Sequence, residues 1–255
     1  MPYLARIILL LLICLAFGTH MSWAAEFEDG AVAQPESAEA EIDWTELDEG
    51  EQELEVWDPI EPFNRGMFWF NDTLYFYLLK PVAKGYNWIM PSFLNKGVTN
   101  FFGNVDDIVV FFNSLLQLKF KQAVSTSARV VWNTTLGLAG FIDVATRFDL
   151  PKYNEDFGQT LAFWGVDSGP FFMLPFLGPS TVRDGLAVPV DWILFDPVFQ
   201  DRELNVTLTL LAVRYTDKRA DLLTATDIID ETAPDKYAYI RDAFLQRREA
   251  YLLYP

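Results

Sequence analysis

The side chains that most often perform covalent or metal chemistry are nearly absent from this chain. The single histidine is His20 and the single cysteine is Cys14, so both lie within the first twenty of 255 positions. No GxSxG or GxxxxGK segment occurs, so the usual serine-nucleophile and ATP-binding motifs are missing. Asp106 and Asp107 are adjacent, but successive residues of a helix point about 100° apart, which is poor geometry for an acid and base pair. The sequence therefore predicts no enzyme, no catalytic residue, no metal and no cofactor.

Charge and hydropathy restrict the partners. The chain has 36 acidic and 19 basic residues and a net charge of -17, which lacks the basic surface that nucleic acid binding needs. Its composition is 51% hydrophobic and 16% aromatic, rich for a water-soluble domain but without the long apolar runs of a multi-span membrane protein. Association with a membrane surface is favoured over nucleic acid.

Residues 1–24 are predicted to be a cleaved signal peptide. Arg6 precedes an apolar run over residues 7–17, and Ser22 and Ala24 occupy the small-residue positions of a cleavage site. The run is too short to cross a bilayer, which needs about 20 apolar residues. Cys14 is a possible lipid attachment site, but Ile13 before it is large and the apolar run continues after it. We expect Cys14 to be removed with the signal, and lipidation is the alternative.

Residues 25–57 are predicted to be an acidic, disordered tether. Between Glu26 and Asp58 the chain has fourteen acidic residues and no Lys or Arg, and a run of one sign does not collapse on its own. The alternative is an acidic docking peptide with Trp44 and Trp57 as anchors.

Residues 58–255 form the predicted folded domain, which we expect to be mostly all-α. Apolar residues at helical spacing predict a helix over residues 63–79 that Pro81 ends. Further helices are predicted over residues 101–118, over 204–229 and after Thr232. Prolines interrupt the apolar block at residues 171–177, so we expect a re-entrant or interfacial loop there. Helices that are apolar on nearly all sides and too short to span a membrane predict short interfacial helices within one leaflet.

Short motifs recur in order through this domain. Residues 58–65 read DPIEPFNR, and further motifs follow at residues 113–117, 129–145, 156–161, 174–184 and 243–247. Together they resemble the MlaA (VacJ) family of outer-membrane phospholipid-transport proteins. Leu118 stands where the family carries a glycine. The motif residues that we expect to be structural are Asp58, Pro59, Asn64, Arg65, Gly178, Pro179, Ser180, Arg183 and Asp184. Arg65 is expected to hold the first helix by a charge-assisted bond, and residues 178–180 to form a turn and helix cap.

The resemblance implies a compact helical ring in the periplasmic leaflet of the outer membrane. It also implies retrograde intermembrane transport, in which phospholipid is removed from the outer leaflet through an amphipathic channel and passed to a soluble periplasmic lipid carrier. A trimeric porin is the second protein partner implied. The alternatives are a porin-associated scaffold without lipid flux and, less favoured, a membrane lipid hydrolase.

A lipid path must have a polar strip for the headgroup and apolar walls for the chains. Exposing two acyl chains to water costs on the order of 24 kcal/mol, at ~0.8 kcal/mol for each of about 30 methylenes. Isolated polar residues among apolar neighbours are candidates for the strip: Asn71, Asp106, Asp107 and Asn113. Alternatively these residues cap helices, or Asp106 or Asp107 pairs with Lys96 or Arg129. The residues of a possible interfacial belt are Trp69, Trp88, Trp132, Trp164 and Trp192, each of which could instead lie in the core.

Overall fold

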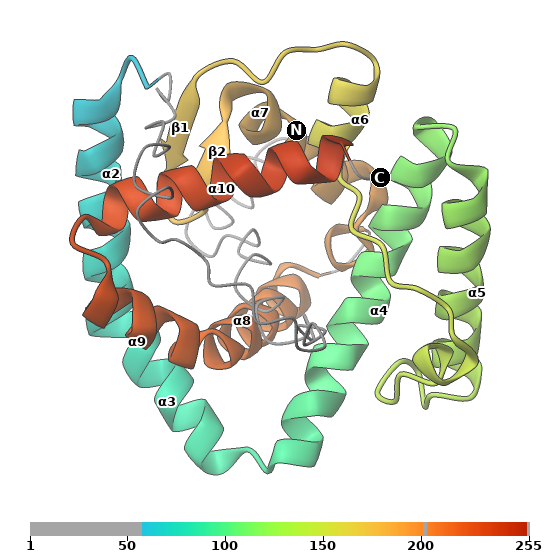
Figure 1. Cartoon of the computed structure of the whole chain (residues 1–255). Coiled ribbons are helices and arrows are strands. Elements are labelled where there is room, and N and C mark those ends of the chain that lie inside the picture. Colours follow the sequence, from blue (N-terminus) through green and yellow to red (C-terminus); the bar gives the residue numbers. More distant parts are fainter. Residues whose placement is uncertain (1–57, 201–202, 254–255) are drawn as a thin grey trace, which may run out of the picture.

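The computed structural model describes residues 58–200 and 203–253, and most of these are helical, as the sequence predicts. The predicted signal peptide with Cys14, and the predicted acidic tether, lie outside the described residues. The helices follow one another around a closed circuit (Figure 1). The elements are α2 (Glu61–Leu74), the π-helical turn η3 (Tyr75–Leu79), α3 (Lys80–Ile89), α4 (Ser92–Leu116), α5 (Phe120–Thr135), η4 (Ala145–Phe148), α6 (Phe157–Phe163), β1 (Phe171–Leu174), β2 (Gly178–Thr181), α7 (Val182–Val190), η5 (Asp191–Phe195), η6 (Pro197–Phe199), α8 (Leu204–Asp221), α9 (Leu223–Thr232) and α10 (Lys236–Leu253).

The predicted helix over residues 63–79 is present, but the prediction that Pro81 ends it is wrong. α2 passes through η3 directly into α3, which continues to Ile89. The Lys80 N–H donates to the carbonyl of Tyr75, five residues back, and Pro81 lies in the first turn of α3. Proline is tolerated in a first turn because its missing N–H is not needed there.

α4 is the longest helix described, with 25 residues, and begins before the predicted start at Phe101. It lies beside α5 on one side of the circuit (Figure 1). No helix of the described residues has both the length and the apolar character for a membrane crossing. The apolar character of α4 is interrupted by the charged residues Lys96, Asp106 and Asp107.

Leu118 closes α4 in a left-handed backbone conformation. Its φ is 60°, its N–H donates to Leu115 O at 3.0 Å, and the Lys119 N–H donates to Ser114 O at 2.9 Å. These two bonds define a Schellman motif, in which the left-handed position is usually glycine. The glycine that the family carries at this place therefore matches the backbone, and Leu118 is strained.

Leu118→Gly should raise the free energy of unfolding by about 1 kcal/mol, because it relieves the left-handed strain. The side chain is 56% exposed, so little packing is lost. Denaturant unfolding in mild detergent measures the change. Leu116→Gly, two residues earlier inside the helix, is the control and should destabilise the protein by a similar amount. Equal destabilisation by both substitutions would contradict the assignment of strain.

Residues 171–181 form a hairpin, so the prediction of a loop at 171–177 is wrong. β1 and β2 pair antiparallel, with Phe171 opposite Thr181 and Met173 opposite Pro179. Phe171 and Met173 are each 1% exposed and alternate with less buried residues, which is the period of a strand. The prolines are accommodated because Pro170 precedes β1, Pro175 lies in the turn and Pro179 lies in a strand with a single partner.

The predicted helix over residues 204–229 is divided at Leu222 into α8 and α9. Leu222 is 2% exposed and packs against Ala225, Ile229, Ile240 and Ala243, so the break joins α9 to α10. Two other small apolar clusters lie around Trp192 and around Phe171 and Tyr237. The apolar contacts of the described residues are therefore distributed around the circuit, and the segments between these clusters are joined by polar side chains.

Candidate functional site

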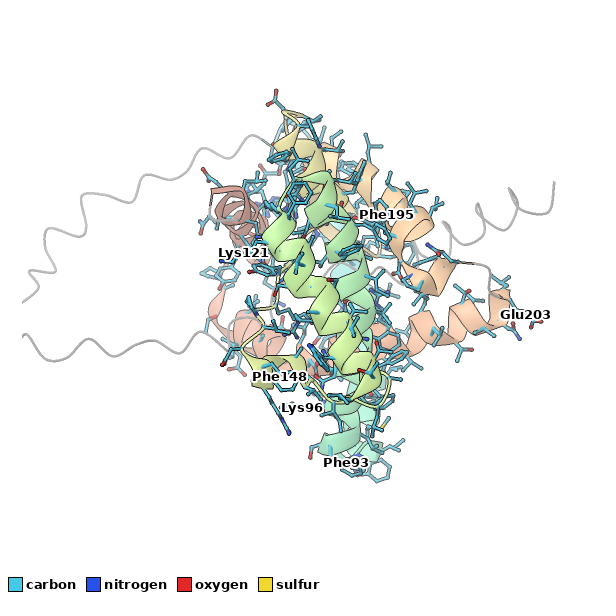
Figure 2. All side chains as sticks on the ribbon, turned by 90° about the vertical axis from the view of Figure 1, so that its right-hand side faces the viewer. Phe93, Lys96, Lys121, Phe148, Phe195 and Glu203 are labelled. Carbon is cyan, nitrogen blue, oxygen red and sulfur yellow. The ribbon has the colours of Figure 1, made fainter. Side chains whose placement is uncertain are left out.

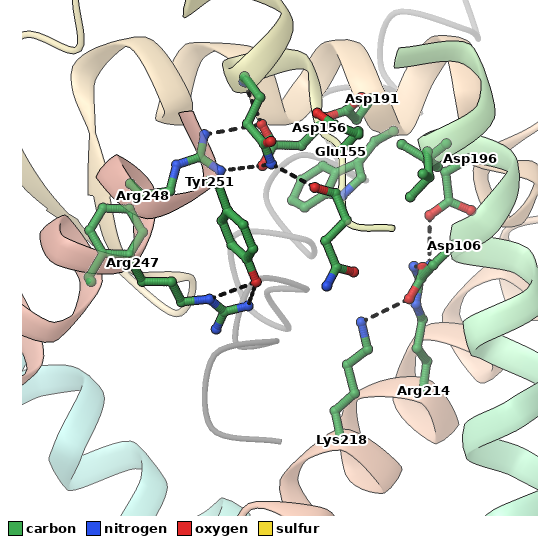
Figure 3. A pocket seen from close by; sticks show the side chains of 16 residues that line it. Asp106, Glu155, Asp156, Asp191, Asp196, Arg214, Lys218, Arg247, Arg248 and Tyr251 are labelled. Carbon is green, nitrogen blue, oxygen red and sulfur yellow. Dashed lines mark hydrogen bonds and ion pairs between the residues drawn. The ribbon is translucent and has the colours of Figure 1, made fainter. Parts of the chain in front are cut away.

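A cavity of about 170 Å³ lies between α4, the segment before α6, η5, α8 and α10. Charged side chains enter it from several sides, as Lys218 does from α8 and Arg247 from α10 (Figure 3). Its apolar wall includes Val109, Val110, Trp192 and Phe244. The site thus combines polar and apolar surface, which suits an amphipathic ligand.

A chain of ion pairs forms one wall of this cavity. Asp106 on α4 bonds to Arg214 of α8, and Lys218 Nζ lies 3.2 Å from Asp106 Oδ2. Arg214 Nη1 also donates to Asp196 Oδ2 at 2.7 Å. Burial raises the pKa of Asp196 to about 6, although the Val198 amide and the charge of Lys218 oppose the shift. These contacts hold α8 against α4 and against the segment that follows η5.

Asp191 lies at the start of η5 and is held by amide groups. Its Oδ1 accepts from Asn113 Nδ2 at 2.8 Å, and its Oδ2 accepts from the Phe157 N–H at 2.9 Å. Burial and the nearby charge of Asp156 raise the pKa of Asp191 to about 7. The charge on this wall of the cavity therefore changes near neutral pH.

Asp191→Asn should become more stable relative to the parent by roughly 1–3 kcal/mol when pH rises from 5 to 8. A raised pKa means that the folded parent holds a proton that the unfolded chain releases, so the contribution of Asp191 to stability is lost as pH rises through about 7. The variant cannot ionise at this position and escapes that loss. Melting curves at both pH values measure the difference, and Asp149→Asn on an exposed turn is the control. A difference between parent and Asp191→Asn that is independent of pH would contradict the prediction.

Arg248 joins the last helix to two other segments. It forms ion pairs with Asp156 at 2.5 Å and with Asp184 at 2.8 Å. Burial disfavours its charge, but the two carboxylates raise its pKa above the ordinary value. Arg183 Nε also donates to Asp184 Oδ1 at 2.9 Å, and both residues are buried. The motif residues Arg183 and Asp184 thus connect α7 to α10.

The opening motif closes the circuit at its other end. Asp58 Oδ1 accepts from Asn64 Nδ2 at 2.7 Å, and Asp58 Oδ2 accepts from the Tyr237 hydroxyl. Asn64 is fully buried, and its side chain also bonds to Phe171 O and to the Met173 N–H. Asn64 therefore joins α2 to β1. It also bonds to Asp58, which holds α10 through Tyr237.

Arg65 forms charge-assisted bonds, as expected, but they extend beyond the first helix. It pairs with Glu61 at 2.6 Å within α2 and with Asp235 at 2.7 Å, just before α10. Its guanidinium lies 4.5 Å from the centre of the Tyr237 ring. Asp235 also accepts from the Ala238 N–H and so caps α10. Pro59 lies in the turn that precedes α2.

The residues expected to form a turn and helix cap lie partly elsewhere. Gly178, Pro179 and Ser180 belong to strand β2, and Gly178 has a φ of 88° at the end of the hairpin turn. The side chain that caps α7 is Thr181, which accepts from the Asp184 N–H. A strand leading directly into a helix explains why the cap is one residue later than predicted.

The four candidate lipid-path residues lie at different depths. Asp106 lines the cavity, and Asn113 lies one bond behind it through Asp191. Asp107 is 1% exposed and pairs with Arg129 at 3.4 Å, the pairing that was the alternative for it. Asn71 bonds to Leu174 O and to the Phe176 N–H, so it holds the hairpin turn. The structure thus brings only Asp106 and Asn113 together around the cavity.

Several cavity residues lie outside the candidates from sequence: Asp191, Asp196, Arg214, Lys218 and Arg248. Asp191 and Asp196 stand alone in the apolar segment 188–199, the same isolation that selected Asp106. That criterion would have found both aspartates. It would not have found the basic residues, because they lie in ordinary charged stretches of α8 and α10. The described residues contain no cluster of three or more carboxylate, thiol or imidazole groups suited to a metal ion.

The outer surface is apolar where the interior is polar. Polar and charged residues outnumber apolar ones among the fully buried side chains described, and many large apolar side chains are exposed. Trp88 is 87% exposed and Phe93, at one end of α4, is 72% exposed (Figure 2). Of the five tryptophans proposed as a belt, Trp192 is buried and the other four are exposed. This distribution is the reverse of that in a water-soluble domain.

Comparison with known proteins gives consistent matches. The model of the family described as "MlaA lipoprotein" matches residues 56–251. The chain is 34% identical over 197 residues to the Escherichia coli (strain K12) protein named "Intermembrane phospholipid transport system lipoprotein MlaA". The aligned region covers 75% of this chain and 77% of that protein. It is 36% identical over 210 residues to a Rickettsia bellii protein described as uncharacterized, with 79% of each chain covered.

A solved structure has the same fold. It is described as "Structural basis for maintenance of bacterial outer membrane lipid asymmetry" and matches with a TM-score of 0.67 at 30% sequence identity. The match covers 76% of this chain and 98% of that one.

Proposed function

We propose a function for this chain from one premise: it belongs to the MlaA lipoprotein family, whose model matches residues 56–251. Its function is intermembrane phospholipid transport, which maintains the lipid asymmetry of the outer membrane. It is a transport protein of the outer membrane and not an enzyme. We also propose a path, a direction and protein partners for this transport.

One observation supports the proposal most strongly: the polarity of the molecule is inverted. Charged residues line the cavity inside the circuit, while tryptophan, phenylalanine and leucine side chains cover the outside. An exposed apolar surface of this extent is unfavourable in water and favourable in lipid. No described helix is suited to crossing the bilayer, so the proposal places the circuit within one leaflet, the periplasmic one.

In this arrangement a phospholipid passes with its headgroup in the charged cavity and its acyl chains against apolar surface. Burying the headgroup charges without polar partners would cost several kcal/mol. Asp106 lies on the proposed path, and Asn113 supports it by holding Asp191. Asn71 and Asp107 are proposed to support the walls through the hairpin turn and Arg129. The direction is retrograde, towards a soluble periplasmic lipid carrier, and a trimeric porin is the proposed neighbour in the membrane.

Deletion and complementation test this function in cells. A strain without the gene should expose more phospholipid on its surface, measured by labelling amine headgroups with a reagent that does not cross membranes. The parent gene should restore the low level. Unchanged surface phospholipid in the deletion strain would contradict the proposal.

Mass spectrometry of lipid that co-purifies in mild detergent separates the alternatives. Intact phospholipid bound to the protein supports transport. Lysolipid or free fatty acid that accumulates with time would support a hydrolase, and absence of lipid would support a porin-associated scaffold.

A further inference from the structure

Lys218 is placed to contact a ligand in the cavity. It extends from α8 into the cavity opposite Arg247 and Tyr251 of α10 (Figure 3). Asp106 is the only carboxylate described within ion-pair distance of its ammonium group, at 3.2 Å. That carboxylate also bonds to Arg214, so the negative charge of Asp106 is divided between two cations.

The carboxylates near Lys218 are shared with other partners. Asp106 and Asp196 both bond to Arg214, and Asp217 accepts from the Tyr86 and Thr99 hydroxyls. Lys152 forms no ion pair with the described residues, and its ammonium lies against Gly103 of α4. Burial and the charges of Arg214 and Lys152 lower the pKa of Lys218 to about 7. Lys218 can therefore pair with an anion that enters the cavity, because Asp106 is its one ion-pair partner among the described residues and is shared with Arg214.

We propose that Lys218, with Arg214 beside it, binds the phosphodiester group of a phospholipid, and that the phosphodiester takes the place of Asp106 at the ammonium. This inference rests on the proposed transport function and adds a binding point to the path. The cavity has room for it, since 170 Å³ holds roughly ten water molecules. That space accepts a headgroup, while two acyl chains remain outside it. Val110 and Trp192 offer apolar contact to the glycerol part.

Titration of the purified full chain with dihexanoylphosphatidylglycerol tests this site, because that lipid has a phosphodiester and no other ionisable group. At pH 6.5, Lys218→Met should weaken binding by roughly tenfold or more, as expected for loss of a bond to a charged group. Lys218→Arg should bind within about threefold of the parent. Lys121→Met, at an exposed position of α5 away from the cavity, is the matched control and should bind like the parent.

The pH profile separates ligand binding from a structural role. From pH 6.5 to 8.5 the parent should lose roughly tenfold in affinity as Lys218 deprotonates, and Lys218→Arg should lose about threefold less than the parent, because the ionisation of Asp191 then causes most of the change in the charge of the cavity. The charged groups that act on Lys218 are Asp106 from α4, Asp196 after η5, Arg214 and Asp217 from α8, and Lys152 before α6. The other charged groups that line the cavity are Glu155, Asp156, Asp191, Arg247 and Arg248. Parallel profiles for the parent and Lys218→Arg would overturn the proposal.

Asp106→Asn gives a test that does not depend on removing the lysine. Because it removes the carboxylate that competes for Lys218, the short-chain lipid should bind about threefold tighter at pH 6.5. Unchanged or weaker binding would overturn the proposal. Inorganic phosphate should bind at least tenfold more weakly than the lipid, and equal affinity would assign the site to free phosphate instead.

The outcome for Lys218 is separable from the outcome for transport. If the parent restores low surface phospholipid in cells and Lys218→Met binds the short-chain lipid as well as the parent does, the Lys218 site fails and transport stands. If the parent does not restore it, transport itself fails.

Discussion

Arg129→Leu should lower the free energy of unfolding by about 3–5 kcal/mol, because it removes the ion-pair partner of the buried Asp107 carboxylate. Arg129 and Asp107 are 2% and 1% exposed. Burial already raises the pKa of Asp107, and the charges of Lys152 and Arg129 oppose that shift. Arg129 Nη2 also donates to Asp143 at 3.0 Å, and its Nη1 donates to Leu150 O at 2.6 Å. Its loss therefore affects α4, α5 and the loop that follows α5.

Denaturant unfolding in mild detergent measures this loss, with Arg147→Leu as the matched control. Arg147 lies in η4, in the segment that follows α5, is exposed and forms no ion pair with the described residues. The control should change stability by less than about 0.5 kcal/mol. Similar changes for the two arginines would show that the buried pair contributes little.

Asn113→Leu should lower the free energy of unfolding by about 2–4 kcal/mol, because at least two buried polar groups lose their partner. Asn113 is fully buried, donates to Asp191 Oδ1 at 2.8 Å and accepts from the Thr160 hydroxyl at 2.8 Å. The bond to Asp191 favours the charged carboxylate and opposes the rise in its pKa. The loss should therefore be larger at pH 8, where Asp191 is ionised, than at pH 5.

Unfolding of the parent and of Asn113→Leu at both pH values tests this expectation. Asn95→Leu on the same helix is the control, since Asn95 is only partly buried and its side chain bonds to Asn87 in an exposed contact. It should have a small effect that does not depend on pH. An equal loss at pH 5 and pH 8 would disconnect Asn113 from the ionisation of Asp191.

The helical fold could be predicted from the sequence because the spacing of apolar residues and the length of the apolar segments still indicate helices in a membrane-associated protein. Apolar residues recur at helical spacing from Phe63 to Tyr77 and again within α4. The prediction that the helix ends at Pro81 failed because the π-helical turn η3 precedes this residue and places it in the first turn of α3. The hairpin was missed because its alternation of buried and less buried residues is short and three prolines lie within or beside it. Its stability also depends on long-range hydrogen bonds to Asn64 and Asn71, which the sequence does not reveal.

The candidate site could be predicted only in part. Isolation among apolar neighbours identified Asp106 and Asn113, since a charge or amide there needs a partner. It also selected Asp107, which faces α5 instead of the cavity, because adjacent helix residues point in different directions. Lys218 and Arg214 lie more than a hundred positions from Asp106. Only the closing of the circuit brings them together.

The contacts of Asp58 with Tyr237 and of Arg65 with Asp235 have a consequence for biogenesis. They join residues 179 and 170 positions apart in the chain. Contacts of such high contact order form late, because the chain entropy of a large loop must be overcome first. The segment that completes them, α10, follows all the other described elements in the chain and is therefore synthesised after them. Until α10 is in place, the apolar surfaces of the earlier helices are prone to aggregation, and we expect a holding chaperone to protect them.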